Sequence, residues 1–469
     1  MSIDSEAGAG APVVNPYLQG NFAPVETELT AVDLQVDGEL PPSLDGRYLR
    51  NGPNPMHADA ASYHWFTGAG MVHGIRLRDG RAEWYRNRWV RAGDVPAELG
   101  EPDPGGPVSE GADFAANTNV IGLAGRCFAL VEAGSKPVEL DLELGTIARS
   151  DFDGTLPNGA TAHPKVDPAT GELHLTNYFW ARPDVAEYAV VSPEGRVVHV
   201  EDIDMPGSPM VHDMSITERH AIFYDLPVTF DVDLAMTGAP LPYTWNPDHP
   251  ARVGVLPLGG SRAHPDAEVR WFEVSPCYVF HPLNAHDVLG DDGEPAAVVL
   301  DVVRHDRVFD RNRLGPDESV PNLWRWTLDL RRGTTTEEQL GDVPLEFPRV
   351  DERRVGRRQR HGWATALSDE RRGSSVFEPD CLYHHDFDTG VVSRHEFGPG
   401  RSVGEAVFVP SSPDADEDDG HLLTLVYDAA TDRSQLVVLA AQDVAAGPVA
   451  TVHLPQRVPY GFHGNWLPA

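Results

Sequence analysis

Short strand-like runs separated by turn residues fill this chain from end to end. Its 44 glycines and 41 prolines are spread over all 469 residues rather than gathered in one linker, and both residue types interrupt helices and favour turns. The run LWRWTLDL (323–330) alternates apolar and polar residues with the period of a strand. Long helical patterns are absent. The sequence therefore predicts a large all-β fold.

Two stretches have the form of β-hairpins. Residues 190–200 (VVSPEGRVVHV) contain a Pro-Glu-Gly turn, and residues 383–397 (YHHDFDTGVVSRHEF) contain Asp-Thr-Gly between two strand-like arms. Two further runs, 296–303 and 421–428, are apolar enough to be deeply buried strands. Many short strands joined by turns favour a β-propeller or a large sandwich.

The organisation of the chain indicates one domain. No WD or kelch repeat is found, and seven blades would each take about 67 residues, so that long loops would have to form a cap over one end. We expect residues 1–15 to be a disordered N-terminal segment and 16–469 to be a single propeller domain. The acidic run 414–420 and the basic run 353–360 are expected to be solvated loops.

Charge and cysteine content limit the partners and the compartment. The chain has 72 acidic and 37 basic residues, a net charge of −35, which repels nucleic acid and anionic lipid headgroups. Its three cysteines contain no CxxC pair and fit a reducing cytosol. The N-terminus lacks the pattern of a secretory signal, and the aliphatic run 436–441 is far too short to span a membrane. We expect a cytoplasmic protein without a transmembrane segment.

Histidine is the residue type most suggestive of chemistry, with twenty copies. No HExxH motif and no Cys/His zinc set selects among them. The pair His384-His385 and the group His57, His64 and His73 compete as ligand candidates on spacing. The residues alone therefore predict a β-propeller that could carry a histidine site, and leave its members open.

The contexts of several of these histidines resemble the carotenoid cleavage oxygenase family, and the resemblance runs nearly end to end. Nine motifs occur in the family's order: 40–55 (LPPSLDGRYLRNGPNP), 63–74 (YHWFTGAGMVHG), 117–141, 161–174 (TAHPKVDPATGELH), 210–228, 280–287 (FHPLNAHD), 345–351 (LEFPRVD), 404–412 (GEAVFVPSS) and 460–466 (YGFHGNW). Nine motifs in order are far more specific than any one of them.

This resemblance implies a seven-bladed β-propeller with a cap of loops and short helices over the iron-centre face. It implies one Fe(II) per chain, with O2 as co-substrate. The positions that match the family's iron ligands are His163, His212, His281 and His463, which follow one another at intervals of 49, 69 and 182 residues. His286 stands where the family usually has an aromatic residue, and it is left out.

The resemblance also implies a set of supporting residues. Glu132, Glu346 and Glu405 match glutamates that accept hydrogen bonds from the ligands' second ring nitrogens, an arrangement that fixes the imidazole tautomer. All three lie in apolar strand contexts, where an unpaired charge would be costly. Thr118 matches a position whose side chain approaches the open face of the iron, and we expect it to shape the O2 site.

The reaction implied is oxidative cleavage of a C=C double bond by O2 into two aldehyde or ketone products. Four neutral imidazoles suit iron and leave two octahedral positions free. The substrate is expected to be an apolar carotenoid or apocarotenoid. The alternative, a stilbenoid or phenylpropenoid alkene, stays open.

Val131 is the residue on which the choice between these substrates depends. Phenol-cleaving members of the family tend to carry a lysine immediately before the first glutamate, which helps to ionise the phenol. Val131 occupies that position here, which argues against phenolate activation, although Lys136 is nearby. Ala69 and Asp287 are two further departures from the family pattern.

Two other classes of function compete with an oxygenase. One is a non-catalytic, ligand-binding propeller with scattered histidines, and the other is a propeller that carries a structural zinc. The sequence leaves open the cleaved bond, the oligomeric state and peripheral membrane contact.

Overall fold

The computed structural model describes residues 14–109, 111–374 and 376–469. Of the segment expected to be disordered, residues 1–13 lie outside the described residues. Asn15, also in that segment, is buried; its side chain donates to the Tyr63 carbonyl and accepts from the Tyr17 amide. Among the described residues no helix is long and apolar enough to cross a membrane.

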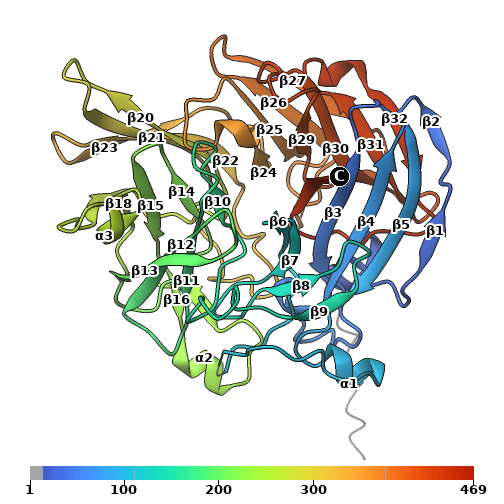
Figure 1. Cartoon of the computed structure of the whole chain (residues 1–469), viewed down its shortest axis with the longest axis horizontal. Helices are drawn as coiled ribbons and strands as arrows, with labels where there is room; N and C mark the ends of the chain where they lie inside the picture. The colour runs from blue at the N-terminus through green and yellow to red at the C-terminus, as the bar shows by residue number, and fades with distance from the viewer. Residues whose placement is uncertain (1–13, 110, 375) are drawn as a thin grey trace, which may run out of the picture.

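Seven antiparallel sheets follow one another around a ring in sequence order, from blue to red in Figure 1. Written from the ring axis outward, the first four blades are: β33 (Gly464–Pro468), β3 (Gly46–Pro53), β4 (Gly70–Arg78), β5 (Arg81–Trp89) and β1 (Thr30–Val32); β6 (Asn119–Leu123), β7 (Arg126–Leu130), β8 (Val138–Leu140) and β9 (Thr146–Arg149); β10 (Lys165–Val166), β11 (Leu173–Tyr178), β12 (Val185–Val191) and β13 (Val197–Asp204); β14 (Met214–Ile216), β15 (His220–Asp225), β18 (Arg252–Pro257) and β19 (Arg270–Glu273).

The last three blades are: β20 (Pro282–Leu289), β21 (Pro295–Arg304), β22 (Asn322–Asp329) and β23 (Thr334–Gln339); β24 (Leu345–Arg349), β25 (His361–Ala366), β26 (Cys381–Asp386) and β27 (Val391–Glu396); β28 (Arg401–Val403) with β29 (Val407–Pro410), then β30 (Gly420–Asp428), β31 (Arg433–Ala440), β32 (Pro448–His453) and β2 (Val36–Gly38). Innermost strands of neighbouring blades contact one another, as β14 does with β10 and β20. The seven-bladed propeller is confirmed.

Two pairings interlock the two ends of the ring. Strand β33 pairs with β3 in the first blade, where Trp466 lies opposite Tyr48. Strand β2 pairs with β32 in the seventh blade. The C-terminus therefore lies beside β3 (Figure 1). Because each of these two blades contains strands from both halves of the chain, neither is complete until the ring closes.

Wedges of apolar side chains between neighbouring blades form the core. Tyr48 and Leu423 belong to the cluster between the first and seventh blades. The largest cluster joins the third, fourth and fifth blades and includes Tyr188, Phe223 and Trp326. Both faces of each blade are thus buried, which accounts for the continuous apolar runs of β21 and β30. The two predicted hairpins are also confirmed, as β12 with β13 and β26 with β27.

Loops and short helices cover one face of the ring. The connection between β15 and β18 contains the extra hairpin β16 (Val228–Phe230) and β17 (Tyr243–Trp245) with α2 (Val232–Met236), and α1 (Val95–Leu99) follows β5. The remaining short elements are η1 (Pro16–Leu18), η2 (Gly20–Phe22), η3 (Trp65–Thr67), α3 (Gly260–Ala263), η4 (Glu352–Arg354) and η5 (Val444–Ala446).

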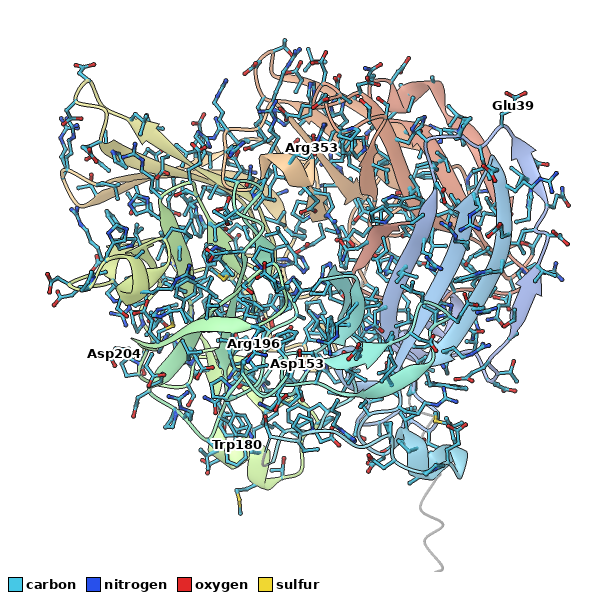
Figure 2. All side chains as sticks on the ribbon, viewed as in Figure 1. Glu39, Asp153, Trp180, Arg196, Asp204 and Arg353 are labelled. Carbon is cyan, nitrogen blue, oxygen red and sulfur yellow. The ribbon has the colours of Figure 1, made fainter. Side chains whose placement is uncertain are left out.

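The basic and acidic runs pack against each other, a contact that our expectation of two solvated loops did not include. Arg353, labelled in Figure 2, donates to the carbonyls of Pro413 and Ala415. Arg354 pairs with Glu417 at 3.3 Å. The local charge excess that the sequence shows at 353–360 is therefore partly neutralised by a neighbouring loop.

Candidate metal centre

Each blade supplies one residue at or just before the start of its innermost strands, where the chain comes closest to the ring axis. Around the ring these positions are Thr118, His163, His212, His281, Glu346, Glu405 and His463. The histidines are far apart in the sequence because they occupy equivalent positions in different blades. A propeller brings such positions together without any local motif.

The four histidines meet in one cluster. Ring centroids of His163 lie 4.4 Å from His212 and 4.6 Å from His463, and those of His281 and His463 lie 4.8 Å apart. The Nε2 atoms of His212 and His281 are 3.4 Å apart. Ligand atoms of His163, His281 and His463 all lie within 4.8 Å of one another. The structure brings together the four residues that the sequence proposed as ligands.

Burial affects the protonation of these imidazoles. It lowers the pKa of His163 well below its ordinary value, and the three neighbouring histidines lower it further. Burial also lowers the pKa of His463, to about 4, although Glu405 opposes the shift. At His212 burial again lowers the pKa, but Glu132, together with Asp213 and Glu346, outweighs burial and the net change is upward. Neutral imidazole is the form that can bind a metal.

A buried nitrogen without a partner tests whether a cation fits this cluster. His163 Nε2 is buried and has no hydrogen-bond partner in the described part of the chain. Such an atom costs free energy unless its lone pair accepts a hydrogen bond or binds a metal ion. Four imidazoles around one point form a donor set suited to zinc, copper or iron. The residues present fit a metal ion.

Three carboxylates hold the outer nitrogens of three of these rings. Nδ1 lies 2.7 Å from Glu132 Oε1 in His212, 2.6 Å from Glu346 Oε2 in His281 and 2.9 Å from Glu405 Oε1 in His463. The contacts of His281 and His463 are hydrogen bonds, and that of His212 is a close approach without hydrogen-bond geometry. A carboxylate at Nδ1 leaves the Nε2 lone pair of a ring directed at the centre. The glutamates chosen from the sequence therefore lie beside the histidines.

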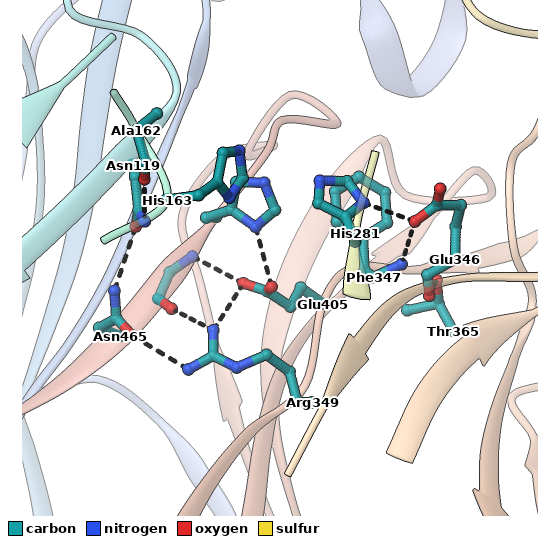
Figure 3. A network of polar contacts seen from close by, with 12 residues as sticks. Asn119, Ala162, His163, His281, Glu346, Phe347, Arg349, Thr365, Glu405 and Asn465 are labelled. Atoms are coloured by element: carbon teal, nitrogen blue, oxygen red, sulfur yellow. Dashed lines mark hydrogen bonds and ion pairs between the residues drawn. The ribbon is translucent and has the colours of Figure 1, made fainter. Parts of the chain in front are cut away.

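Each of these carboxylates has a second partner that the sequence reading missed. Glu405 pairs with the Arg349 guanidinium (Figure 3), at a distance of 3.2 Å. Glu346 accepts from His305 Nε2 at 2.8 Å, and Glu132 accepts from the Tyr178 hydroxyl at 2.6 Å. His305, Tyr178 and Arg349 come from β-strands or strand ends and have no local motif, so only the pairing of strands could reveal them.

The partners also set the charge on two of the glutamates. Burial raises the pKa of Glu405, but Arg349 and His463 outweigh it, so that the pKa falls well below the usual range. Burial likewise raises the pKa of Glu346, and His281 with His305 reverse the effect. Both carboxylates are therefore anionic acceptors near neutral pH.

His163 is supported differently from the other three histidines. Its Nδ1 lies 3.7 Å from Asp213 Oδ2, beyond a normal hydrogen bond. Asp213 is itself buried and paired with Lys165, whose ammonium lies 2.7 Å from Oδ1. The carboxylate is thus paired with the lysine and not hydrogen-bonded to His163, so His163 is less firmly oriented than its neighbours.

The competing histidines make contacts of their own. His384 bonds to His361 at 3.0 Å and to Ser393 at 3.1 Å, and His385 bonds to the Tyr383 hydroxyl. His73 bonds to the Tyr85 hydroxyl, and His64 caps η3. His57 is exposed, and His286 is half-buried in β20. The groups of histidine, cysteine and acidic side chains that could hold a metal in the described chain contain none of them.

A cavity of about 1180 Å³ opens onto this cluster. His212, His281 and His463 line it, together with Glu132 and Thr118. The Thr118 hydroxyl donates to Asn117 Oδ1 at 2.9 Å, and its carbonyl accepts from the His463 amide. Most of the remaining wall is apolar, with aromatic contributions from Trp65, Phe66, Phe280, Phe347 and Phe462.

The cavity mouth carries exposed apolar side chains. Phe114, Trp180, Val232 and Met236 line it and are all exposed, Met236 at 83%. Trp180 stacks on Phe230 of the extra hairpin and lies at the α2 end of the molecule in Figure 2. The mouth would let an apolar molecule enter from an apolar surface.

The positions that depart from the family pattern have clear places in the structure. Val131 lines the cavity beside Glu132, whereas the Lys136 ammonium is buried and donates to the carbonyls of Leu156, Pro157 and Asn158. Ala69 also lines the cavity, and Asp287 binds His220 at 2.7 Å on the fourth and fifth blades. Lys136 is therefore not a wall residue of the cavity.

Comparison with known proteins places these features in a family context. A family model described as retinal pigment epithelial membrane protein matches residues 22–468. The chain is 45% identical to a carotenoid cleavage oxygenase of Mycobacterium tuberculosis, over 97% of this chain and 98% of that protein. It is 34% identical to the carotenoid 9,10(9',10')-cleavage dioxygenase 1 of Pisum sativum, over 96% and 90%. Its structure is similar to the lignostilbene dioxygenase of Pseudomonas brassicacearum (TM-score 0.86, 31% identity, 97% of this chain and 99% of that one).

Proposed function

This chain belongs to the carotenoid cleavage oxygenase family and is an alkene-cleaving dioxygenase; we propose that it cleaves a carotenoid or apocarotenoid with O2 at an Fe(II) held by His163, His212, His281 and His463. One iron is expected per chain. The observation that carries the proposal is a cluster of four buried imidazoles, three with a carboxylate at Nδ1, at the wall of a large apolar cavity.

The chain's own residues have three tasks in this proposal. Glu132, Glu346 and Glu405 fix the tautomer of three imidazoles and supply negative charge outside the ligand set. The apolar wall excludes water and places one double bond of the substrate beside the cluster. Thr118, on the same wall, restricts the space next to the ligands. When bound, iron supplies the activation of O2 that an organic side chain cannot provide.

Access to the cluster favours a catalytic metal over a structural one. A structural zinc site is closed by four protein ligands. Here three of the four histidines line the cavity, so small molecules can reach the metal position. The same access argues against a purely ligand-binding propeller, since such a protein has no need of neutral imidazoles with paired outer nitrogens.

Cavity size and lining favour a polyene over a phenolic alkene. Pockets for drug-sized ligands measure about 300–1,000 Å³, and this cavity is larger at about 1180 Å³. A phenol could be ionised by a lysine beside Glu132, but Val131 occupies that position and Lys136 is tied to three carbonyls. The phenolic alternative rests on the likeness to the lignostilbene dioxygenase.

Two further aspects of the function are proposals. All three cysteines are unpaired and buried, which supports a protein that works in the reducing cytosol. The apolar mouth supports peripheral contact with an apolar carrier such as a membrane, from which a polyene could pass directly into the cavity.

The test is a substrate panel on iron-loaded protein. We expect β-carotene or an apocarotenal to yield two carbonyl products whose masses sum to substrate plus O2, with no turnover under argon or after chelation. A 4-hydroxystilbene should react at least about tenfold more slowly, because no lysine or arginine is among the described residues that line the cavity to pair with its phenolate. Faster turnover of the stilbene would show that the proposed substrate is wrong. Protein that binds no iron would contradict the proposed reaction.

A further inference from the structure

Asp317 is a carboxylate on the cavity wall that the proposed reaction does not use. It lies in the long loop between β21 and β22, and burial raises the pKa of its carboxyl group. Among the described residues no lysine, arginine or histidine forms an ion pair with it. Glu132, Glu346 and Asp113, which also line the cavity, do have basic partners: the two glutamates pair with histidines and Asp113 pairs with Arg149. A half-buried carboxylate without a basic partner still loses part of its hydration and calls for a hydrogen-bond donor.

Two donors hold this carboxylate and leave part of it free. The Tyr17 hydroxyl donates to Oδ2, and the Phe377 amide donates to Oδ1 at 2.9 Å. Each carboxylate oxygen can accept two hydrogen bonds. One acceptor position therefore remains on each oxygen, on a side chain that borders the cavity.

The surroundings of Asp317 keep it in a fixed position. Three segments far apart in sequence meet at the carboxylate: η1, the loop after β21 and the loop after β25. Tyr17 stacks on Trp65 (5.7 Å, 10°), which in turn stacks on Tyr460 (5.7 Å, 17°). A Cβ added to Gly315 would lie 2.1 Å from the Tyr17 hydroxyl, so the loop is shaped around this contact. The acceptor is pre-organised rather than a mobile surface group.

We propose that Asp317 determines specificity by accepting a hydrogen bond from an alcohol on the ring end of the polyene substrate. This inference rests on the proposed function and names its substrate class as hydroxylated polyenes. An uncharged alcohol fits because it donates one O–H bond to a carboxylate and adds no charge. A phenolate does not fit, since two anions would lie side by side without a cation.

The experiment compares two apocarotenals that differ only in a 3-hydroxyl on the ring. Wild-type protein is expected to prefer the hydroxylated compound in kcat/KM. Asp317→Asn and Asp317→Leu should lower kcat/KM for that compound about tenfold to a hundredfold, chiefly through KM, because a hydrogen bond to a charged group is lost. Both variants should stay within about twofold of wild type on the compound without the hydroxyl.

The matched control is Asp306→Asn, an exposed carboxylate of the same loop (79%) that pairs with Arg304. It should change neither constant, and melting temperatures of all variants report on folding. If Asp317→Leu does not fold, Asp317→Asn, which keeps an acceptor for Tyr17, decides the question. Equal losses on both substrates, or no wild-type preference, would overturn the role of Asp317. Failure of the wild type to cleave either compound would instead overturn the proposed function.

Discussion

Replacing His463 with alanine is expected to leave a folded protein that retains no iron after dialysis and has lost at least about a thousandfold in turnover. Loss of an outer hydrogen-bond partner costs roughly 10–100-fold in metal affinity, and loss of a ligand itself should cost more. Glu405 would keep its contacts with Arg349 and the Gly464 amide. The ring should therefore close normally without this imidazole.

Iron per chain, measured by elemental mass spectrometry beside the melting temperature, checks this result. His212→Ala should behave in the same way. The matched control is His384→Ala, which removes a similarly buried histidine of the sixth blade whose side chain bonds, within the described residues, to His361 and Ser393. A His463→Ala protein with one iron and near-normal turnover would contradict the assignment of ligands.

Replacing Arg349 with leucine should produce the largest loss of stability, about 3–5 kcal/mol in the free energy of unfolding. Arg349 lies 3.2 Å from Glu405, which is only 2% exposed, and donates to the Gly464 carbonyl and Asn465 Oδ1 on the closing strand β33. Without the guanidinium the Glu405 charge stays buried with fewer partners, and β33 loses two contacts at once. Figure 3 shows both sets of bonds.

Denaturant unfolding of the metal-free protein measures this loss. Arg358→Leu is the control, since that arginine is 64% exposed on its side chain and pairs with an exposed aspartate, and exposed pairs contribute about 0–1 kcal/mol. Adding Glu405→Gln to Arg349→Leu should restore part of the stability because it removes the unpaired charge. A single variant within about 1 kcal/mol of wild type would refute the role of this ion pair.

The strands could be predicted from the sequence because their signals are local, whereas those signals left a propeller or a sandwich open and the seven blades came from the family resemblance. Alternation at 323–330 and the two turn-centred hairpins depend on neighbouring residues, and the structure confirms them. The choice of the four histidines could not be made from local signals, because His163 and His463 meet only through strand pairing across the ring. Spacing left twenty candidates, and a resemblance over the whole chain was needed to choose four.

The rest of the site depends on contacts that no local pattern encodes. Arg349, His305 and Tyr178 each reach a glutamate from another strand or blade, and Asp317 meets Tyr17 across 300 residues. The extra hairpin at β16 and β17 inside the fourth blade was also not predicted. The turn residues at 226–246 are typical of any loop. Only the packing of this segment over the cavity gives it a role.

The interlocked ring has a consequence for biogenesis. During translation at about 5–20 residues per second, roughly 15–60 s separate the emergence of His163 from that of His463. Throughout this interval a nascent chain holds at most three of the four histidines, and β3 still lacks its partner β33. The complete four-histidine cluster can therefore form only after His463 has emerged. A stalled or truncated product that lacks β33 cannot complete the ring and cannot assemble the site proposed for the iron.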